Sequence, residues 1–319
     1  MRARSFWVES PGLGAIRSHD LPPPGPGEVL IEADYSGISR GTESLVFRGG
    51  VPLELAETMR CPFQVGDLPG PVKYGYMSVG RIVAGDGPIG QAVFCLHPHQ
   101  DRYVVPSAMT TPIPDGVPPG RAVLAANLET ALNGIWDAAP GPGDDITVIG
   151  GGVVGCLSGW LAAGIPGCRV QLVDIDPKRA EIAAALGMAF SLPDEARGEQ
   201  DLILHASGAP AGLRTALGLA GVEATIIELS WYGDREVSLP LGGAFHPRRL
   251  QIRGSQVGRI PPGRAPRWDF QRRMGVVMRL LTAPVLDVLI NAEGAFEALP
   301  QTMSDLGGAL CHRVVYPRP

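Results

Sequence analysis

The first 125 residues carry short runs in which apolar positions recur at every second residue. Val29, Ile31, Ala33 and Tyr35 form one such run, and three later runs have the same character: SVGRIVAG, QAVFCL and DRYVVP. Proline and glycine clusters such as LPPPGPG punctuate this part of the chain. A period of two is typical of strands that bury one face, and the frequent turns indicate an irregular β-rich domain over residues 1–125.

After residue 125 the pattern changes to strand-like apolar runs that alternate with helix-like runs. The helical text AVLAANLETALNGIWDA at 122–138 leads into it. The strand-like runs are DITVI, RVQLV, DLILH and ATIIEL, with helix-like runs between them at about 153–164, 177–186 and 210–220. This alternation predicts βαβ units, so we expect residues 126–258 of this α/β chain to form a doubly wound, Rossmann-type parallel sheet.

The last part of the chain, residues 259–319, has a mixed pattern. It begins with the loop RIPPGRAPR, continues with the helix-like WDFQRRMGVVMRLL and ends near the strand-like RVVY. We expect this tail to return to the β-rich domain, which then consists of residues 1–125 plus 259–319.

Composition narrows the class of partner. A formal net charge of -5 over 319 residues provides no basic stripe for a phosphate backbone, so we expect a small-molecule substrate and no nucleic acid. Five cysteines without a CxxC pair indicate reduced thiols and a cytoplasmic location. No run approaches the roughly 20 apolar residues that a membrane span requires, so we expect no membrane partner.

Three glycines follow the apolar strand DITVI and open a helix. Gly150, Gly152 and Gly155 have the GxGxxG spacing, and Val153 and Val154 begin the helix. The first glycine permits a tight turn, the second lets backbone amides approach a pyrophosphate, and the third lets helix and strand pack closely. The motif in this context predicts a dinucleotide cofactor; glycines that only pack a strand on a helix are the alternative.

An acidic residue then ends the next strand, 24 positions after Gly150: Asp174. A carboxylate there can accept hydrogen bonds from the ribose hydroxyls and repels the extra phosphate of NADP, which favours NAD(H). Arg179 and Lys178 lie one turn further on and leave NADP(H) open as the alternative. Ser207, beyond the strand DLILH, is a further expected cofactor contact.

Three stretches carry a resemblance to a known family. GEVLIEADYSGIS with RGTES, YGYMSVGRIVAG and LETALNGIWDAAPGPGDDITVIGGGVVG resemble two active-site loops and the entry to the cofactor domain of the medium-chain dehydrogenase/reductase family. The resemblance extends over nearly the whole chain. It implies a GroES-like β-rich domain beside the Rossmann domain, an NAD(P)-dependent alcohol dehydrogenase or reductase, and a homodimer. The first two loops most resemble the zinc-lacking branch that contains bacteriochlorophyllide a dehydrogenase.

The positions that hold catalytic zinc in other members differ here. Ser39 stands where the first Cys would be, Tyr76 and Met77 where His-Glu would be, and Ala126 or its neighbour where the second Cys would be. No thiolate or imidazole remains at these places, and the four-cysteine lobe is missing as well. We therefore expect no zinc.

A second group of candidate metal-binding side chains lies at residues 95–99. Cys95, His97 and His99 alternate along a strand-like run and can share one face. Pro98 separates the two histidines and no fourth ligand is apparent, so we favour a site without metal.

Without zinc, side-chain donors must manage the hydroxyl proton of the substrate. Thr42 resembles the position whose hydroxyl relays that proton in zinc-dependent relatives, and the Tyr76 phenol can point at the substrate oxygen. Glu43 is expected to orient the loop. The alternatives are a loop-capping hydroxyl for Thr42 and a packing role for Tyr76.

Five residues complete the predicted substrate pocket: Ser39, Lys73, His97, Trp231 and Tyr232. Lys73 can steer an anionic substrate and His97 can relay protons, with a solvated charge and a packed ring as their alternatives. The two aromatic residues follow a strand of the parallel sheet at its carboxyl edge, where ligands lie.

The predicted function is zinc-independent interconversion of an alcohol and a ketone or aldehyde by hydride transfer with NAD(H). A quinone or enoyl reductase using NADPH is one alternative. A dinucleotide-binding sensor or partner protein without turnover is another.

Overall fold

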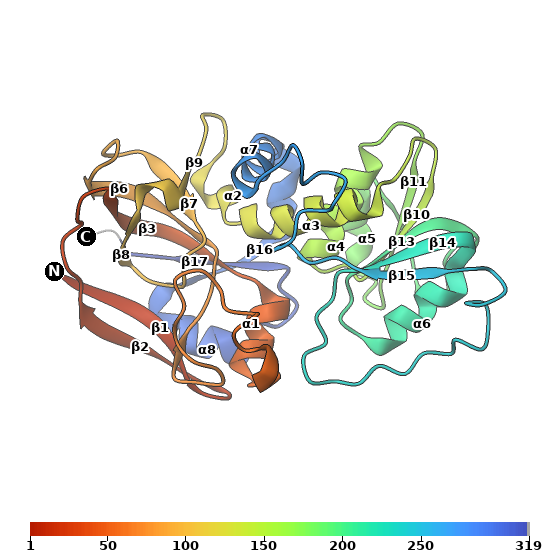
Figure 1. Cartoon of the computed structure of the whole chain (residues 1–319), viewed down its shortest axis with the longest axis horizontal. Helices are drawn as coiled ribbons and strands as arrows, with labels where there is room; N and C mark the ends of the chain where they lie inside the picture. The colour runs from red at the N-terminus through yellow and green to blue at the C-terminus, as the bar shows by residue number, and fades with distance from the viewer. Residues whose placement is uncertain (318–319) are drawn as a thin grey trace. The chain divides into compact units, whose positions relative to one another are not determined.

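The computed structural model describes residues 1–317, and the chain folds into two compact units (Figure 1). Unit 1 comprises Met1–Ala126 and Met274–Pro319, and unit 2 comprises Asn127–Arg273. The predicted segment 259–319 therefore divides: residues 259–273 belong to unit 2, and residues 318–319 lie outside the described part. Residues 259–273 belong to unit 2 because they pack there: the ring centroids of Trp268 and Trp136 lie 4.8 Å apart.

Unit 1 contains two sheets. The larger has the order β16-β17-β3-β6-β7-β9, with β8 also paired to β3, and the smaller has the order β2-β1-β5-β4. The strands of the larger sheet are β3 (Glu28–Ile38), β6 (Ser78–Gly85), β7 (Ala92–Cys95), β8 (Arg102–Pro106), β9 (Thr110–Pro112), β16 (Ile290–Ala295) and β17 (Cys311–Val315). Those of the smaller sheet are β1 (Arg2–Ser10), β2 (Leu13–Asp20), β4 (Val65–Gly66) and β5 (Val72–Lys73).

The long strand β3 lies at the centre of the larger sheet, which explains its burial. It pairs antiparallel with β6, β8 and β17. Val29, Leu30 and Ile31 are consecutive and all buried, so both faces of the strand are covered there. The apolar positions at every second residue therefore include only some of the buried residues of this strand.

Short helices complete unit 1, and two longer helices cross the boundary between the units. The short helices are α1 (Arg40–Phe47), α2 (Pro119–Ala122) and α8 (Leu299–Ser304), and the longer ones are α3 (Ala125–Ala138) and α7 (Phe270–Leu280). Short 3-10 helices occur at Leu53–Leu55, Ser107–Met109, Pro193–Glu195, Pro284–Leu289 and Phe296–Ala298. Within the described residues no helix is long and apolar enough to cross a membrane.

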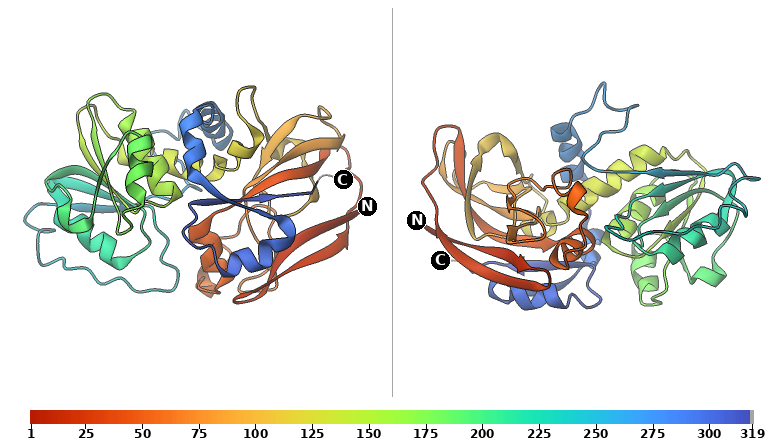
Figure 2. Two further views of the ribbon diagram at one scale, coloured as in Figure 1. Left: turned by 180° about the vertical axis from the view of Figure 1, so that it is seen from behind. Right: turned by 60° about the horizontal axis from the view of Figure 1, so that its bottom comes forward.

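Unit 2 is built on a six-stranded parallel sheet, which confirms the predicted fold class (Figure 2). The strand order is β12-β11-β10-β13-β14-β15, or 3-2-1-4-5-6 in chain order within the unit, the doubly wound arrangement of dinucleotide-binding domains. The strands are β10 (Asp145–Ile149), β11 (Arg169–Val173), β12 (Ala189–Ser191), β13 (Gln200–His205), β14 (Ala220–Glu228) and β15 (Gln251–Gly254).

Three helices connect these strands: α4 (Val153–Ala163), α5 (Arg179–Ala185) and α6 (Pro210–Leu219). The strand order reverses between β10 and β13, where the backbone N–H of Ala206 donates to the carbonyl of Ile149 at 2.8 Å. In sheets of this kind, ligands bind outside the carboxyl ends of the strands at the reversal. The glycine turn and Ser207 both follow these two strand ends.

Candidate cofactor and catalytic site

Two glycines of the turn after β10 are required by contact with neighbouring backbone. Gly150 has φ +104°, and a Cβ there would lie 2.6 Å from the backbone N and Cα of Ser207. A Cβ on Gly155 would lie 2.0 Å from the carbonyl oxygen of Gly150. Both substitutions would force backbone apart, so these glycines allow the turn, helix α4 and the Ser207 segment to pack closely.

Gly152 has a different environment. It is the N-cap of α4 at φ -74°, and no atom lies within 4 Å of the place a Cβ would occupy. The fold itself therefore does not require glycine here. Open space directly against the backbone at a helix N-terminus is what the close approach of a phosphate needs, so this position fits a dinucleotide. Val153 and Val154 form the first turn of the helix behind it.

Asp174 lies beside the turn and is already held in place by backbone. Its carboxylate accepts the N–H of Gly151 at 2.6 Å and the N–H of Asp176 at 2.8 Å. Two carboxylate oxygens offer about four lone-pair sites, so acceptor capacity remains for ribose hydroxyls. Arg179 lies across the same turn: its Cγ is 3.0 Å from the Cβ position of Gly151, and it pairs with Asp176 at 3.5 Å.

The carboxyl ends of β13 and β14 carry two polar side chains that were not among the predicted site residues, His205 and Glu228. His205 is fully buried and forms hydrogen bonds with Glu228 through Nδ1 and with Ser207 through Nε2. The Tyr232 hydroxyl donates to Glu228 at 3.1 Å. A signal was present in the sequence, because His205 and Glu228 each follow an apolar run at the end of a strand. Their pairing, however, depends on the adjacency of the two strands.

In unit 1, Glu43 is a buried anchor in the first turn of α1. Its carboxylate accepts the backbone N–H of Ser39 at 2.8 Å and the Nε2–H of His99 at 2.8 Å. The other ring nitrogen of His99 lies 2.7 Å from the Ser36 hydroxyl, which in turn lies 3.0 Å from the Tyr316 hydroxyl. These contacts hold Glu43 against the segment that we expect it to orient, and RGTES begins helix α1 rather than a loop.

The Tyr76 phenol joins the two hydroxyl groups of the first active-site segment. It forms side-chain hydrogen bonds with Ser39 and Thr42, so the structure brings these three expected site residues together. Burial, and secondarily the negative charge of Glu43, raises the pKa of Tyr76 above its ordinary value. The phenol is therefore protonated at neutral pH and available as a donor.

Lys73 and His97 are buried rather than presented at a surface. Lys73 Nζ donates to the side-chain oxygen of Gln100 at 2.7 Å, and burial lowers the pKa of Lys73 to about 8. The ring of His97 stacks on Tyr103 with centroids 3.7 Å apart, and burial lowers the pKa of His97 well below its ordinary value. The buried position of Lys73 therefore does not support its predicted role, in which a surface charge steers an anionic substrate.

The residues considered for metal binding have other partners. Cys95 Sγ donates to the Met109 carbonyl at 3.5 Å and His97 Nδ1 to the Pro98 carbonyl at 2.9 Å, while His99 is held by Glu43. Within residues 1–317, no three or more His, Cys, Asp or Glu side chains are grouped as a metal would require. The serine, tyrosine and alanine that replace the family's zinc ligands do not fit zinc.

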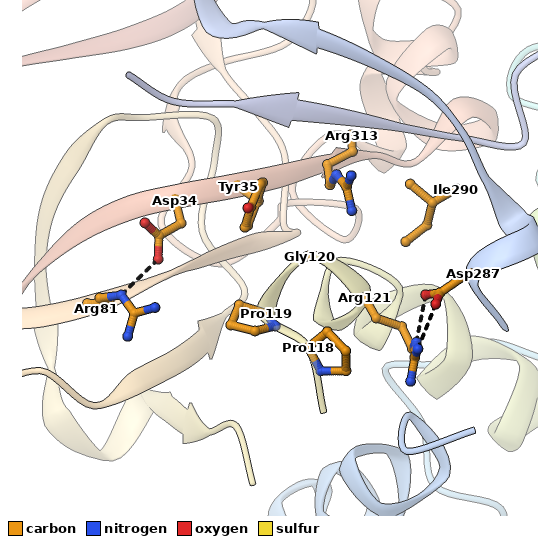
Figure 3. A pocket seen from close by; sticks show the side chains of 10 residues that line it. All are labelled: Asp34, Tyr35, Arg81, Pro118, Pro119, Gly120, Arg121, Asp287, Ile290 and Arg313. Atoms are coloured by element: carbon orange, nitrogen blue, oxygen red, sulfur yellow. Dashed lines mark hydrogen bonds and ion pairs between the residues drawn. The ribbon is translucent and has the colours of Figure 1, made fainter. Parts of the chain in front are cut away.

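A cavity of unit 1 with a volume of about 510 Å³ lies away from the predicted site residues (Figure 3). It is lined by Asp34, Tyr35, Arg81, Pro118, Pro119, Gly120, Arg121, Asp287, Ile290 and Arg313. Its arginines are already paired with carboxylates: Arg121 binds Asp287 at 2.6 and 2.7 Å. None of the predicted site residues lines this cavity.

Comparison with known proteins defines the class of the chain. No family model matches the sequence. It is 25% identical to D-guloside 3-dehydrogenase of Escherichia coli (77% of this chain, 78% of the relative). It is 28% identical to 2-desacetyl-2-hydroxyethyl bacteriochlorophyllide A dehydrogenase of Rhodobacter capsulatus (71% of each chain).

Solved structures share the fold over nearly the whole chain. One is a putative zinc-binding dehydrogenase from Sinorhizobium meliloti bound to NADP, with TM-score 0.79, 18% identity and 99% coverage of both chains. Another is described as a short chain alcohol dehydrogenase from Escherichia coli CFT073 complexed with NADH, with TM-score 0.78, 19% identity and 99% coverage of both chains.

The fold and the glycine turn, together with these relatives, define an oxidoreductase with a nicotinamide cofactor. The chain is an enzyme of the alcohol or polyol dehydrogenase type, similar to the medium-chain dehydrogenases among its relatives and structural neighbours.

Proposed function

We propose that this chain is an NAD(H)-dependent, zinc-independent dehydrogenase that interconverts an alcohol and a ketone or aldehyde. The observation that carries the cofactor preference is Asp174, whose carboxylate is fixed by the Gly151 and Asp176 amides beside the glycine turn. A carboxylate in this position favours free ribose hydroxyls and disfavours a 2′-phosphate. Arg179 beside the turn is the feature that favours NADP(H), and its pairing with Asp176 offsets that charge.

The nicotinamide supplies hydride transfer when it is bound, and the protein supplies binding and orientation. Gly152 presents open backbone at the N-terminus of α4 for the pyrophosphate. Asp174 holds the ribose, and Ser207 lies beside Gly150 at the strand reversal. Each role follows from a contact or an open space in unit 2.

We assign the transfer of the substrate hydroxyl proton to Tyr76 and Thr42 of unit 1. The Tyr76 phenol is protonated at neutral pH, so it donates to a carbonyl oxygen during reduction, and the Thr42 and Ser39 hydroxyls hold it in position. This donor set stands where other family members would use zinc. Glu43 fixes the segment and does not react, since both its oxygens hold donors of the protein.

The first experiment is a fluorescence titration with NADH and NADPH, combined with metal analysis of the same sample. We expect tighter binding of NADH and less than stoichiometric zinc. Stoichiometric zinc would refute zinc independence, and a preference for NADPH would favour the quinone or enoyl reductase alternative.

The second experiment is a substrate screen with matched variants. The two relatives justify including glycosides and aromatic compounds with a hydroxyethyl group. Tyr76→Phe should lower kcat at least about tenfold, because general acid–base groups typically contribute about 10² or more. Tyr74→Phe is the control, since its hydroxyl donates to the Met59 carbonyl outside the proposed donor set. If neither Tyr76→Phe nor Thr42→Ala lowers turnover, the proton assignment is wrong.

A further inference from the structure

Three side chains at the carboxyl edge of the parallel sheet form a continuous hydrogen-bonded chain. Ser207 Oγ lies 2.6 Å from His205 Nε2, and His205 Nδ1 lies 2.7 and 2.8 Å from the two carboxylate oxygens of Glu228. They come from the end of β13, the turn after it, and the end of the neighbouring strand β14. All three belong to unit 2, and no role in hydride transfer requires this particular sequence of groups.

The direction of the hydrogen bonds follows from the chemistry of the groups. An ionised carboxylate only accepts, so Nδ1 of His205 carries the proton that is shared with Glu228. In the neutral imidazole, Nε2 is then an acceptor. The Ser207 hydroxyl donates to it at 2.6 Å in preference to the Ala209 carbonyl, which lies farther away at 3.4 Å. A serine whose proton is directed at a histidine that a carboxylate orients is the arrangement that activates a hydroxyl nucleophile.

The surroundings hold this arrangement rigid. Glu228 also accepts the backbone N–H of Ser230 at 2.7 Å and the hydroxyl of Tyr232 at 3.1 Å. Arg235 lies over the Tyr232 ring at 5.7 Å and donates to the Gly208 carbonyl. His205 is fully buried, whereas Ser207 as a residue is exposed, so the base is shielded and the nucleophile is accessible.

Two features act directly on the serine oxygen. The backbone N–H of Ala209 lies 3.2 Å from Ser207 Oγ, at the start of the ten-residue helix α6, and stabilises negative charge that develops there. A Cβ on Gly212 would lie 2.3 Å from that oxygen and 2.8 Å from His205 Nε2. Glycine in the first turns of α6 is therefore what leaves room for the serine–histidine contact.

We propose that Ser207, His205 and Glu228 form an activated serine, a second reactive site that accepts an acyl group from activated carboxylic esters. Ser207 Oγ forms a bond to the carbonyl carbon, and the bond from that carbon to the leaving oxygen breaks. His205 Nε2 takes the serine proton and gives it to the leaving oxygen, so no atom changes oxidation state and no co-reactant is needed. This acyl transfer shares no chemical step with the proposed hydride transfer, although Ser207 is also an expected cofactor contact, so the activity is tested without cofactor.

The test uses the full chain without cofactor and p-nitrophenyl acetate as the acyl donor. Peptide mapping by mass spectrometry at several times gives the rate of acetylation at each serine. Ser304 is an internal control, because it is exposed and its hydroxyl donates only to the Pro300 carbonyl among the described residues. We expect Ser207 to be acetylated at least about 100-fold faster than Ser304, the contribution typical of a positioned general base. Equal rates would overturn the proposal.

Variants separate activation from simple exposure. His205→Gln should reduce the rate at Ser207 about 100-fold, and Glu228→Gln at least about tenfold, with Ser304 unchanged. Gly212→Ala leaves all three groups in the chain but displaces the serine oxygen, so it should lower the rate as His205→Gln does. Circular dichroism melts confirm that each variant is folded. A rate at Ser207 that is unchanged in folded His205→Gln or folded Gly212→Ala would refute the assignment.

Discussion

Removal of the Glu43 side chain should destabilise unit 1 far more than removal of an exposed carboxylate. In Glu43→Ala, two buried donors lose their acceptor: the backbone N–H of Ser39 and Nε2–H of His99. A buried donor left unsatisfied costs about 1–3 kcal/mol, so the free energy of unfolding should fall by about 2–6 kcal/mol. Glu43→Gln keeps one acceptor and should lose about half as much.

The loss should also spread along the hydrogen-bonded chain. Because the Glu43 carboxylate fixes Nε2 of His99 as a donor, Nδ1 accepts the Ser36 hydroxyl and Ser36 accepts that of Tyr316. Without Glu43 this order is no longer enforced. Hydrogen exchange should therefore quicken in segments 36–48 and 311–316, while helix α4 of unit 2 is unaffected.

The assay is urea unfolding followed by circular dichroism, together with peptide-level hydrogen exchange. Glu297→Ala is the matched control, because it also removes a glutamate paired with a basic group, but its partner is Arg4 and its side chain is 50% exposed. Exposed pairs contribute about 0–1 kcal/mol. If Glu43→Ala costs no more than Glu297→Ala, the buried network does not stabilise this unit as we argue.

Three further predictions concern the lysine, the glycine turn and the cofactor carboxylate. Lys73 has a pKa of about 8 when folded against 10.5 when free, so between these values the unfolded chain binds more protons and stability rises with pH. Relative to Lys73→Met, the wild type should gain about 3 kcal/mol from pH about 7 to above about 10.5, measured by urea unfolding; a constant difference would contradict this. Gly155→Ala should lower the melting temperature because its Cβ meets backbone, whereas Gly152→Ala should melt as the wild type but bind NADH at least about tenfold more weakly. Asp174→Asn should weaken NADH binding by about 10- to 100-fold and bring the dissociation constants of NADH and NADPH closer together. If fluorescence titrations give the same ratio of these two constants as in the wild type, Asp174 does not determine cofactor selectivity.

The unit 2 strands were predictable because buried parallel strands appear as continuous apolar runs. DITVI and RVQLV coincide with β10 and β11. Two short elements were not predictable. β12 has only three residues, and α1 contains a glycine near its start and depends on the Glu43 carboxylate to hold Ser39.

The site residues also differ in whether the sequence alone could predict them. The glycine turn could be predicted because spacing along the chain alone defines it. The pairing of His205 with Glu228 could not, since it needs the neighbouring positions of β13 and β14. The burial of Lys73 depends likewise on Gln100, 27 residues away, which no local pattern brings to it.

The position of β17 in the larger sheet of unit 1 determines when that unit can be completed during synthesis. β17 pairs with residues 35–38 of β3, so this end of the central strand remains unpaired on one side until residues 311–315 leave the ribosome. Unit 2 lies between β3 and β17 in the sequence, so all of its strands are synthesised before β17. Unit 1 is therefore completed only after unit 2 has been synthesised, and an exposed strand edge must be protected during that interval.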